Sequence, residues 1–359
     1  MDAMLTIGDF ARATGLTPKA LRRYDELGLL RPARVDPFSG YRYYAGEQAE
    51  RARLVGWLRR IGMPLAEIGR VCALYETDAA GAARAIRAYW ARVEHETATR
   101  RDLAASLVDR MKGTTGMNSM NDRNPRTPDL TFRAALLLDP GLTRPSQQDA
   151  AHAGARLLAV ADGYGPEGGA AATGAVAALG AVPTPTRAGD LLNALEAGLR
   201  EANEAVARCA ESGTTLTAAL LAGNRLALAH VGDSRAYLLR DGALRRLTRD
   251  HTVVQELVDA GELSPAEAAA RPDRALLLKA LDGGDVPPEP ELALHELRAG
   301  DRLLLCTDGL SAVVPAEEIA PALTRGADPA ATARELIGRA RDRGAPDNVA
   351  CVLADVVDQ

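Results

Sequence analysis

Two aspartates in this chain of 359 residues end strongly apolar stretches, and this makes them the first candidates for chemistry. Asp162 follows the run LLAVA and Asp308 follows RLLLCT, each within an Asp-Gly dipeptide. An aspartate at the end of a strand is well placed to project into a site shared with other strands. Hard divalent cations such as Mg²⁺ and Mn²⁺ take several oxygen ligands, chiefly carboxylates and water. Asp-Gly is also an ordinary turn signal, so a metal site and a capped turn both remain open.

Other aspartates divide between the same two interpretations. Asp233, in HVGDSR, and Asp347, which opens the last apolar stretch, extend the candidate metal set. Asp241-Gly242 lies between RAYLLR and ALRRL and is typical of a hairpin turn, and Asp282-Gly283 is typical of a loop.

The N-terminal part carries a different kind of chemistry, because its charge is basic. Residues 1–112 hold 19 Lys and Arg against 14 Asp and Glu, whereas the remainder holds 24 against 34. A basic segment suits a polyanion such as nucleic acid, although a solvated surface explains the same count. The side chains that could contact DNA lie in one expected helix and in the loop after it: Thr17, Lys19, Arg22, Arg23, Tyr24, Tyr41 and Arg42.

The elements that must position these side chains follow from local signals. Thr6 is expected to cap a helix over 7–13 that Gly15 ends, and Thr17-Pro18 starts a second helix that runs to about Leu27. Two short helices joined by a tight glycine turn form a helix-turn-helix unit. Residues 33–44 read as a wing, and a second helix pair is expected at about 46–60 and 64–75. A small helical bundle with a solvated Arg face is the alternative.

Residues 82–112 predict one long helix with a weak coiled-coil seam. Apolar residues recur every three or four positions from Ile86 to Met111, interrupted by Thr97 and Arg100. Such a stripe needs a partner, and we expect a second copy of the chain, with packing on the same chain as the alternative. Residues 113–129 are rich in Gly, Ser, Thr, Asn and Pro and are expected to form a flexible linker.

After this linker, strands and helices mix in a pattern that predicts an α+β layered fold. Strands are expected at 156–163, 301–309 and 348–356, and four successive strands between 215 and 248 are expected to form a meander. Helices are expected at 168–179, 190–211, 316–324 and 328–343.

Composition excludes several classes of protein. No apolar run approaches the roughly 18 residues of a membrane span, and the N-terminus shows no secretory signal. The four cysteines are scattered singly, which argues against a disulfide scaffold or a zinc finger and suits a reducing cytoplasm.

The N-terminal motifs resemble the MerR family of transcriptional regulators. The stretch LTIGDFARATGLTPKALRRYDELGLLRPARVDPFSGYRYY contains T-I-G, A-L-R-x-Y-x-x-L-G-L-L and G-Y-R-x-Y in order. The resemblance covers residues 4 to about 75 and implies a winged helix-turn-helix domain at 1–75, a dimerisation helix at 82–112 and a homodimer on double-stranded promoter DNA. Arg23 departs from the aromatic residue of many members, and the missing Cys or His cluster argues against metal sensing.

The C-terminal motifs resemble the metal-dependent serine/threonine protein phosphatases of type 2C. Seven motifs occur in order: RxxxQDA, LLAVADGxG, GTTLTA, AHVGDSRAYLLRDG, LTRDHT, LLLCTDGL and PDNV. The resemblance implies a phosphatase domain at 130–357, folded as two antiparallel sheets packed face to face with helices outside, an α-β-β-α sandwich. It also implies phosphorylated Ser/Thr proteins as substrates and two or three Mn²⁺ or Mg²⁺ ions.

The same resemblance assigns a role to each motif residue. Asp162 would bridge two ions with the Gly163 carbonyl as a further ligand, Asp308 and Asp347 would hold the first ion, and Asp149 would sit beside the second. Asp233 with Asp308 matches a third, weaker site, and Arg144 would hold the substrate phosphate. The catalytic set is therefore Arg144, Asp162 and Asp308, whereas His230 and His251 are expected to be structural.

Two departures bear on activity. Gln148 stands where many members have Glu, and Pro166 stands where many have Gly. Loss of a carboxylate would weaken the second ion, and Pro166 removes one backbone N–H. We expect an active phosphatase fused to a DNA-binding dimer. The alternatives are a regulator with a catalytically silent phosphatase-like sensor or docking domain, and an enzyme whose front half serves only for dimerisation.

Overall fold

The computed structural model describes residues 4–115, 129–183, 185, 190–326 and 328–359. These residues form two compact units. One consists of residues up to Glu94 together with Glu256–Ala268, and the other contains the remainder. In the part of the chain so described, no helix is both long and apolar enough to cross a membrane.

The N-terminal unit is built mainly from helices whose ends the sequence predicts well. The Thr6 hydroxyl accepts a hydrogen bond from Asp9 N–H, and Thr17 accepts one from Ala20 N–H, so both side chains cap helices. Gly15 ends the first helix in the left-handed conformation. The helices are α1 (Ile7–Thr14), α2 (Pro18–Glu26), α3 (Gln48–Arg60), α4 (Leu65–Thr77) and the first part, up to Glu94, of α5 (Ala79–Thr115).

A small antiparallel sheet accompanies these helices. β2 (Arg34–Val35) and β3 (Arg42–Ala45) pair within the stretch 33–44 that was expected to form a wing. β1 (Met4–Thr6), which the sequence did not suggest, pairs with β3. The carboxylate of Asp36 accepts hydrogen bonds from the N–H groups of Phe38 and Ser39, at 2.9 and 2.8 Å, and so shapes the turn.

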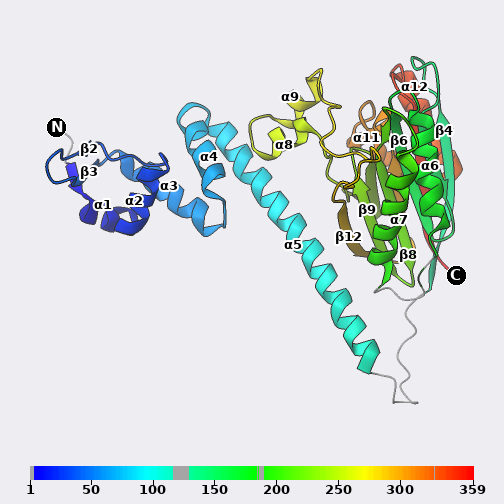
Figure 1. Cartoon of the computed structure of the whole chain (residues 1–359), viewed down its shortest axis with the longest axis horizontal. Helices are drawn as coiled ribbons and strands as arrows, with labels where there is room; N and C mark the ends of the chain where they lie inside the picture. Colours follow the sequence, from blue (N-terminus) through cyan, green and yellow to red (C-terminus); the bar gives the residue numbers. More distant parts are fainter. Residues whose placement is uncertain (1–3, 116–128, 184, 186–189, 327) are drawn as a thin grey trace. The chain divides into compact units, whose positions relative to one another are not determined.

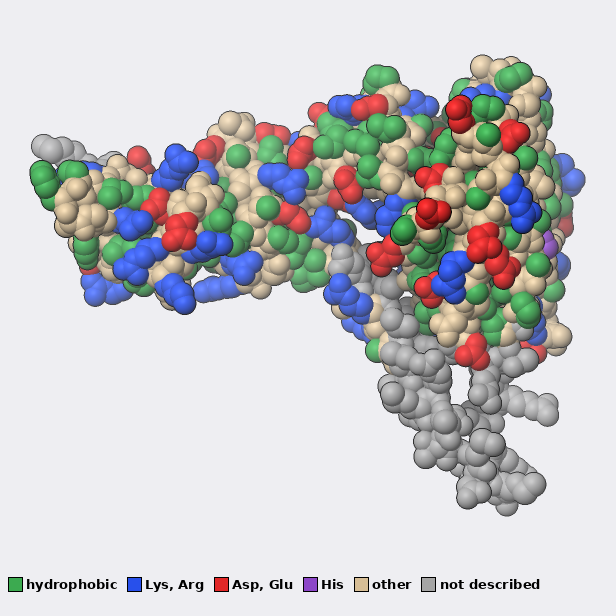
Figure 2. Space-filling view, in the orientation of Figure 1, with side chains coloured by type: hydrophobic (Ala, Val, Ile, Leu, Met, Phe, Trp, Pro, Cys, Tyr) green, Lys and Arg blue, Asp and Glu red, His purple; other side chains and the backbone are tan. Residues whose placement is uncertain are grey.

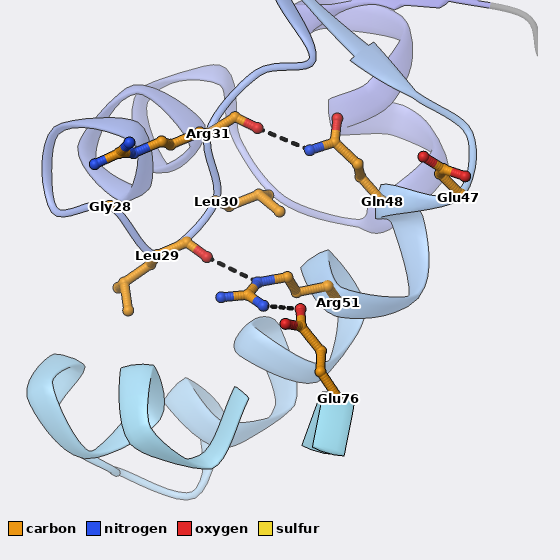
Figure 3. A pocket seen from close by; sticks show the side chains of 8 residues that line it. All are labelled: Gly28, Leu29, Leu30, Arg31, Glu47, Gln48, Arg51 and Glu76. Carbon is orange, nitrogen blue, oxygen red and sulfur yellow. Dashed lines mark hydrogen bonds and ion pairs between the residues drawn. The ribbon is translucent and has the colours of Figure 1, made fainter. Parts of the chain in front are cut away.

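The loop that follows α2 is fixed to the second helix pair. It borders a cavity of about 460 Å³, in which Gln48 donates to the Arg31 carbonyl at 2.8 Å and Arg51 donates to the Leu29 carbonyl at 3.0 Å (Figure 3). Arg51 also pairs with Glu76 of α4. These contacts fix the loop after α2 against α3 and α4.

The long helix α5 differs from the expectation in what its first turns do. Ala82, Ala85 and Tyr89 are buried in the core of their own unit, and Ile86 and Val93 pack against that core. The first part of the predicted coiled-coil seam is therefore used within the chain. The helix begins three residues before the expected 82 and extends to Thr115, three residues into the expected linker 113–129. Residues 116–128 of that linker lie outside the described residues.

The larger unit is dominated by two antiparallel sheets. A five-stranded sheet has the order β11-β10-β13-β14-β4. In a six-stranded sheet, five strands follow the order β12-β9-β8-β6-β5, and β7 pairs with β6 off this path. The strands are β4 (Leu130–Asp139), β5 (Asp149–Ala153), β6 (Leu157–Tyr164), β7 (Gly213–Thr214), β8 (Leu216–Ala222), β9 (Arg225–Val231), β10 (Arg235–Arg240), β11 (Ala243–Arg246), β12 (Glu291–Glu296), β13 (Arg302–Cys306) and β14 (Val349–Asp358).

The sheets face each other across an aliphatic core and carry helices on their outer faces (Figure 1). Side chains of both sheets, such as Leu158, Val160, Leu303 and Val352, fill the space between them. One pair of helices, α6 (Gly168–Ala181) and α7 (Leu191–Val206), covers the six-stranded sheet. A second pair, α11 (Ala316–Arg325) and α12 (Pro329–Asp342), covers the five-stranded sheet. The short helix α10 (Asp308–Ser311) belongs to this unit. The short helices α8 (Val253–Asp259) and α9 (Pro265–Ala270) belong to it only in part, because Glu256–Ala268 is assigned to the other unit.

The four strands expected as one meander are present, but they belong to two sheets. β8 and β9 pair in the six-stranded sheet, whereas β10 and β11 pair in the five-stranded sheet. The chain crosses between the sheets at Gly232-Asp233-Ser234. The strands on either side of the crossing, β9 and β10, are apolar on both faces, and each buries these faces within its own sheet. This crossing places Asp233 at the end of the sandwich where the other candidate aspartates lie.

Candidate active site

Four of the five predicted carboxylates line one cavity of about 410 Å³ in the larger unit. Asp162 lies in β6, and Asp233 lies in the crossing between the sheets. Asp308 follows β13, and Asp347 precedes β14. The cavity is lined by Arg144, Gln148, Asp162, Gly163, Tyr164, Gly165, Thr215, Asp233, Ala275, Leu276, Leu277, Asp308 and Asp347. Residues that are far apart in sequence therefore share one site.

Close approaches of the chain distinguish the glycines that follow Asp162 and Asp308 from Gly242, which follows Asp241. A Cβ on Gly309 would lie 1.8 Å from the Asn348 carbonyl oxygen, and one on Gly163 would lie 2.0 Å from the Gly168 carbonyl oxygen. By contrast Gly242, with a φ of +77°, has nothing within 4 Å of that position. Gly242 serves the backbone turn, whereas Gly163 and Gly309 let two segments touch beside the site.

Asp149 stands directly behind the cavity, opposite Asp162 in the register of β5 and β6. Its carboxylate accepts a hydrogen bond of 2.8 Å from the Thr307 hydroxyl, and that hydroxyl accepts one of 2.9 Å from Ala350 N–H. Thr307 thereby links β5 of one sheet to β13 and β14 of the other.

Asp308 and Asp347 differ in how their oxygens are satisfied. The Asp347 carboxylate receives Arg144 Nη2 at 2.6 Å and Asn348 N–H at 2.9 Å. The Oδ1 atom of Asp308 is buried and has no hydrogen-bond partner. A buried carboxylate oxygen without a partner is costly while the group is ionised, so this atom is a candidate ligand for a cation.

The electrostatics of the cavity favour a bound cation. Burial raises the pKa of Asp149 to about 7, and the Asp308 and Asp347 carboxylates reinforce the rise while the Thr307 hydroxyl opposes it. Burial and the neighbouring carboxylates also raise the pKa values of Asp162, Asp233 and Asp308. A positive charge among these groups would remove their mutual repulsion.

The donor set fits a hard divalent cation. It consists of carboxylate oxygens, with the Gly163 carbonyl beside them, and it includes the unsatisfied Asp308 Oδ1. No three acidic, imidazole or thiol groups among the described residues already surround a single point.

The two departures in the site have local structural roles. Gln148 Nε2 donates to the Gly165 carbonyl at 2.8 Å, which a glutamate could not do. Pro166 occupies the second position of a turn closed by Gly168 N–H and the Gly165 carbonyl at 3.3 Å, a position that favours proline. Both residues thus shape the loop after β6.

The two histidines form a buried support beneath the Asp233 turn. His230 contacts the Thr217 hydroxyl at 2.8 Å, and His251 Nδ1 accepts Gly232 N–H at 3.2 Å. Burial lowers the pKa of His230 and lowers that of His251 to about 3, so both imidazoles are neutral at physiological pH. Neither lines the cavity.

Sequence reasoning missed several residues that support or line this site. Thr307 and Asn348 are adjacent to predicted aspartates, and that adjacency was the available signal. Thr215 accepts the Asp162 N–H at 3.0 Å and bonds Ser234 at 2.8 Å. Leu276 and Leu277 come from a segment with no motif of its own.

The residues expected to contact DNA separate into two groups. Lys19, Arg22 and Arg23 are exposed on α2, and Thr17 and Tyr41 are exposed at its start and in the wing. Figure 2 shows Lys and Arg side chains gathered on one side of the N-terminal helices.

Two of these expectations need correction. Tyr24 is 7% exposed and packs in the core with Leu21, because it lies one helical turn after that residue. Arg42 is half-buried and pairs with Asp25 at 2.7 Å. Both therefore stabilise the unit, and neither presents a free side chain to solvent.

Two family models match separate parts of the chain. Residues 145–354 match the model of protein phosphatase 2C, and residues 5–74 match that of the MerR HTH family of regulatory proteins.

Individual relatives match the C-terminal part. The serine/threonine protein phosphatase PstP of Mycobacterium tuberculosis is 49% identical over 238 residues, which are 64% of this chain and 46% of that protein. The chain thus spans less than half the length of this relative. A serine/threonine phosphatase stp of Listeria welshimeri is 37% identical over 164 residues, 44% of this chain and 65% of that protein.

Solved structures give the same result. The PstP crystal structure has a TM-score of 0.61 and 47% identity, covering 64% of this chain and all of that one. The PstP catalytic domain in complex with two manganese ions has a TM-score of 0.59 and also 47% identity, with the same coverage of both chains. With its converging aspartates and the family match over residues 145–354, the chain belongs to the protein phosphatase 2C family, and it carries a MerR-type helix-turn-helix sequence in front.

Proposed function

We propose that the larger unit is a metal-dependent phosphatase that removes phosphate from phosphoserine and phosphothreonine in proteins. The observation that carries this proposal is the buried Asp308 Oδ1, which lacks a partner in a cavity shared with Asp162, Asp347 and Arg144. The likeness to PstP, a serine/threonine protein phosphatase, supports the reaction and the substrate class.

The chain's carboxylates are the proposed metal ligands. Asp162 and the Gly163 carbonyl would serve two ions, Asp308 and Asp347 the first ion, Asp149 the second, and Asp233 a third. When bound, such ions supply a water that is acidic enough to attack at neutral pH and neutralise the phosphoryl oxygens.

Arg144 is the proposed phosphate-binding residue. Its side chain is about half exposed at the cavity and holds Asp347 through one nitrogen, so the guanidinium can also receive an anion. A guanidinium fork fits two phosphoryl oxygens at once. The residues that line the cavity include no Ser, Cys or His, and the Thr215 hydroxyl already bonds Asp162 N–H and Ser234. This supports hydrolysis by water without a covalent intermediate on Ser, Cys or His.

The experiment compares phosphopeptide turnover in Mn²⁺ between the wild type and Asp308→Asn. We expect a loss of roughly 100-fold or more, the size typical when a charge that stabilises the transition state is removed. Asp241→Asn is the matched control, because Asp241 belongs to the exposed hairpin turn. Equal rates for all three proteins, or no turnover by the wild type, would favour the silent sensor or docking domain.

We propose further that the N-terminal unit is a winged helix-turn-helix that binds double-stranded promoter DNA as a homodimer. The exposed Lys19, Arg22 and Arg23 on the capped helix α2 support DNA binding. Because Tyr89 and its neighbours pack within the chain, dimerisation would depend on the later part of residues 82–112. A salt-dependent shift of duplex DNA and the mass of the protein in solution test the two parts of this proposal separately.

A further inference from the structure

β4 forms one edge of the five-stranded sheet, and its second half has an unusual composition for an edge strand. It ends the order β11-β10-β13-β14-β4, with β14 as its partner (Figure 1). Residues 134–138 read AALLL, without a charged residue, glycine or proline. Leu136 is 38% exposed and Leu138 is 43% exposed. Edge strands of soluble proteins are usually short, charged or covered, because their unpaired backbone groups bind other strands.

Two other edges of the sandwich show that usual protection. β11, at the opposite side of the same sheet, is four residues long and ends in Arg245 and Arg246. β12, an edge of the six-stranded sheet, begins with Glu291 and ends with Glu296. β4 differs from both, because it is ten residues long and carries an uncharged, apolar stretch.

The backbone groups of this stretch are directed away from β14. The N–H groups of Leu130 and Phe132 donate to the carbonyls of Gly223 and Ala155, at 3.2 and 2.9 Å, and these carbonyls lie in turns of the six-stranded sheet. Alternate residues of a strand direct their N–H and C=O groups to the same side, so the even-numbered residues that follow face this free edge as well. These residues are Ala134, Leu136 and Leu138. No strand among the described residues pairs with them there.

The stretch is complementary to a second copy of itself. When two copies pair antiparallel about Leu136, each Leu136 faces its counterpart, and Ala134 of one copy faces Leu138 of the other. All three residues direct their backbone groups to the free edge, so the pairs form about six hydrogen bonds. The same register sets Arg133 of one copy opposite Asp139 of the other, since both residues lie three positions from Leu136.

The opposite charges at the two ends favour this register over its neighbours. The Arg133 side chain is 64% exposed and holds Asp355 through Nη2 at 2.7 Å, and Asp139 holds Arg341 of α12 at 2.7 Å. Pairing across the axis would join these two ion pairs into one network. A register shifted by two residues would set Arg133 opposite Leu137 or beyond the end of β4, and the opposite charges would no longer meet.

We propose that the free edge of β4 joins a second copy of the chain, so that two five-stranded sheets continue into one across a two-fold axis at Leu136. Such an isologous contact uses the same surface on both copies, which closes the apolar edge and prevents open-ended association. The side chains of Leu136 and Leu138 are covered on one face, and Arg133 meets Asp139 on the other. The contact lies within the larger unit, and it depends neither on the metal site nor on the dimer contact proposed for residues 82–112.

Cysteine cross-linking of the full chain tests this pairing. Opposed residues of a hydrogen-bonded pair have Cα atoms about 5.5 Å apart, within the range of a disulfide. Leu136→Cys faces itself across the axis and should form a covalent dimer under mild oxidation with copper–phenanthroline. Leu138→Cys is the matched control, because it is similarly exposed on the same strand but lies about 13 Å or more from its own counterpart. We expect Leu136→Cys to cross-link at least about tenfold faster than this control.

A double variant tests the register. Ala134→Cys and Leu138→Cys should each cross-link slowly, whereas the chain that carries both should cross-link about as fast as Leu136→Cys. The wild type gives the background from the native cysteines, three of which are buried while Cys209 is partly buried. Because cross-linking reports on this edge alone, its result is independent of any contact through residues 82–112 and of turnover.

Hydrogen–deuterium exchange gives a second readout in chains without added cysteines. Leu136→Lys sets two ammonium groups against each other at the axis, so we expect residues 134–138 to exchange roughly tenfold faster than in the wild type. Since Leu136 is exposed, the Tm of the folded chain should change little. Leu142→Lys is the matched control, because Leu142 is 58% exposed and lies beyond the end of β4. It should leave the exchange of residues 134–138 as in the wild type.

Several results would overturn the inference. Leu136→Cys that cross-links no faster than Leu138→Cys would exclude the axis at Leu136. Equally slow exchange in the wild type and in Leu136→Lys would mean that another segment of the same chain covers the edge. Equally fast exchange in both would mean that the edge stays open.

Discussion

The hydroxyl of Thr307 donates to the carboxylate of Asp149 across the two sheets, at 2.8 Å. Both residues are almost completely buried. This hydrogen bond holds an aspartate of the six-stranded sheet against the residue that links β13 to Asp308.

Removal of that hydroxyl should weaken the site. In Thr307→Val the Asp149 carboxylate and the Ala350 N–H lose their partner, which costs about 1–3 kcal/mol in the free energy of unfolding. The pKa of Asp149 should rise further, and Mn²⁺ affinity should fall at neutral pH. Chemical denaturation and Mn²⁺ titration measure both effects. Thr307→Ser keeps the hydroxyl and should behave like the wild type. Wild-type stability and Mn²⁺ affinity in Thr307→Val would contradict the role given to this hydrogen bond.

Stability without metal should fall as the pH rises from about 4 to 7. The pKa of Asp149 is about 7 in the folded protein against an ordinary 3.8, so the folded state holds a proton that the unfolded state releases in this window. The stabilisation is complete below pH 4 and is lost as the pH passes 7. The raised pKa values of Asp162, Asp233 and Asp308 act in the same direction.

Thermal unfolding in EDTA from pH 5 to pH 8 measures this dependence. Mn²⁺ should reverse it by raising the Tm most above pH 7, where it competes with the fewest protons. The pKa of Asp250 is lowered by Arg246 and Arg235 although burial opposes this, so its contribution is lost only in more acidic solution, outside the window. A Tm in EDTA that stays flat or rises toward pH 8 would contradict the proposed electrostatics.

Gln148→Glu should lower the stability of the loop after β6 and raise the affinity for metal. The variant loses the donor to the Gly165 carbonyl and places a carboxylate against that oxygen, so we expect the metal-free protein to lose about 1 kcal/mol. The added negative charge should make the rise of Tm with Mn²⁺ larger than in the wild type. Differential scanning fluorimetry with and without Mn²⁺ tests both directions, and Gln148→Ala, which lacks donor and charge, should show the first effect only.

Substitutions in the N-terminal unit should separate DNA contact from structure. Arg22→Ala should weaken binding to duplex DNA and reduce the salt slope by about one charge. Arg42→Ala should instead lower the Tm, because it breaks the pair with Asp25. Tyr24→Phe should leave both nearly unchanged, since the ring is buried. Fluorescence anisotropy at several salt concentrations distinguishes these outcomes; a wild-type salt slope in Arg22→Ala would remove α2 from the interface.

Local signals in the sequence sufficed where capping and apolar runs determine the structure. The caps Thr6 and Thr17 start helices at the expected residues, and the apolar strands before Asp162 and Asp308 lie where they were predicted. The spacing of Leu21 and Tyr24 could also have shown that Tyr24 faces the core, since residues three apart share a helix face.

The rest depends on contacts between distant segments. β5, with the sequence DAAHA, has no apolar run and exists because it pairs with β6. β4 and β12 were missed as well, and the crossing at Gly232-Asp233-Ser234 follows from sheet partners rather than from local pattern.

The most direct test of the account is anomalous diffraction at the manganese edge from crystals of the full chain grown with Mn²⁺. We predict at least two strong peaks in the cavity, within bonding distance of Asp162 and of Asp308 or Asp347, and their loss in Asp308→Asn. An empty cavity in crystals grown at high Mn²⁺, or peaks only at surface carboxylates, would contradict the claim that these aspartates form a metal-dependent active site.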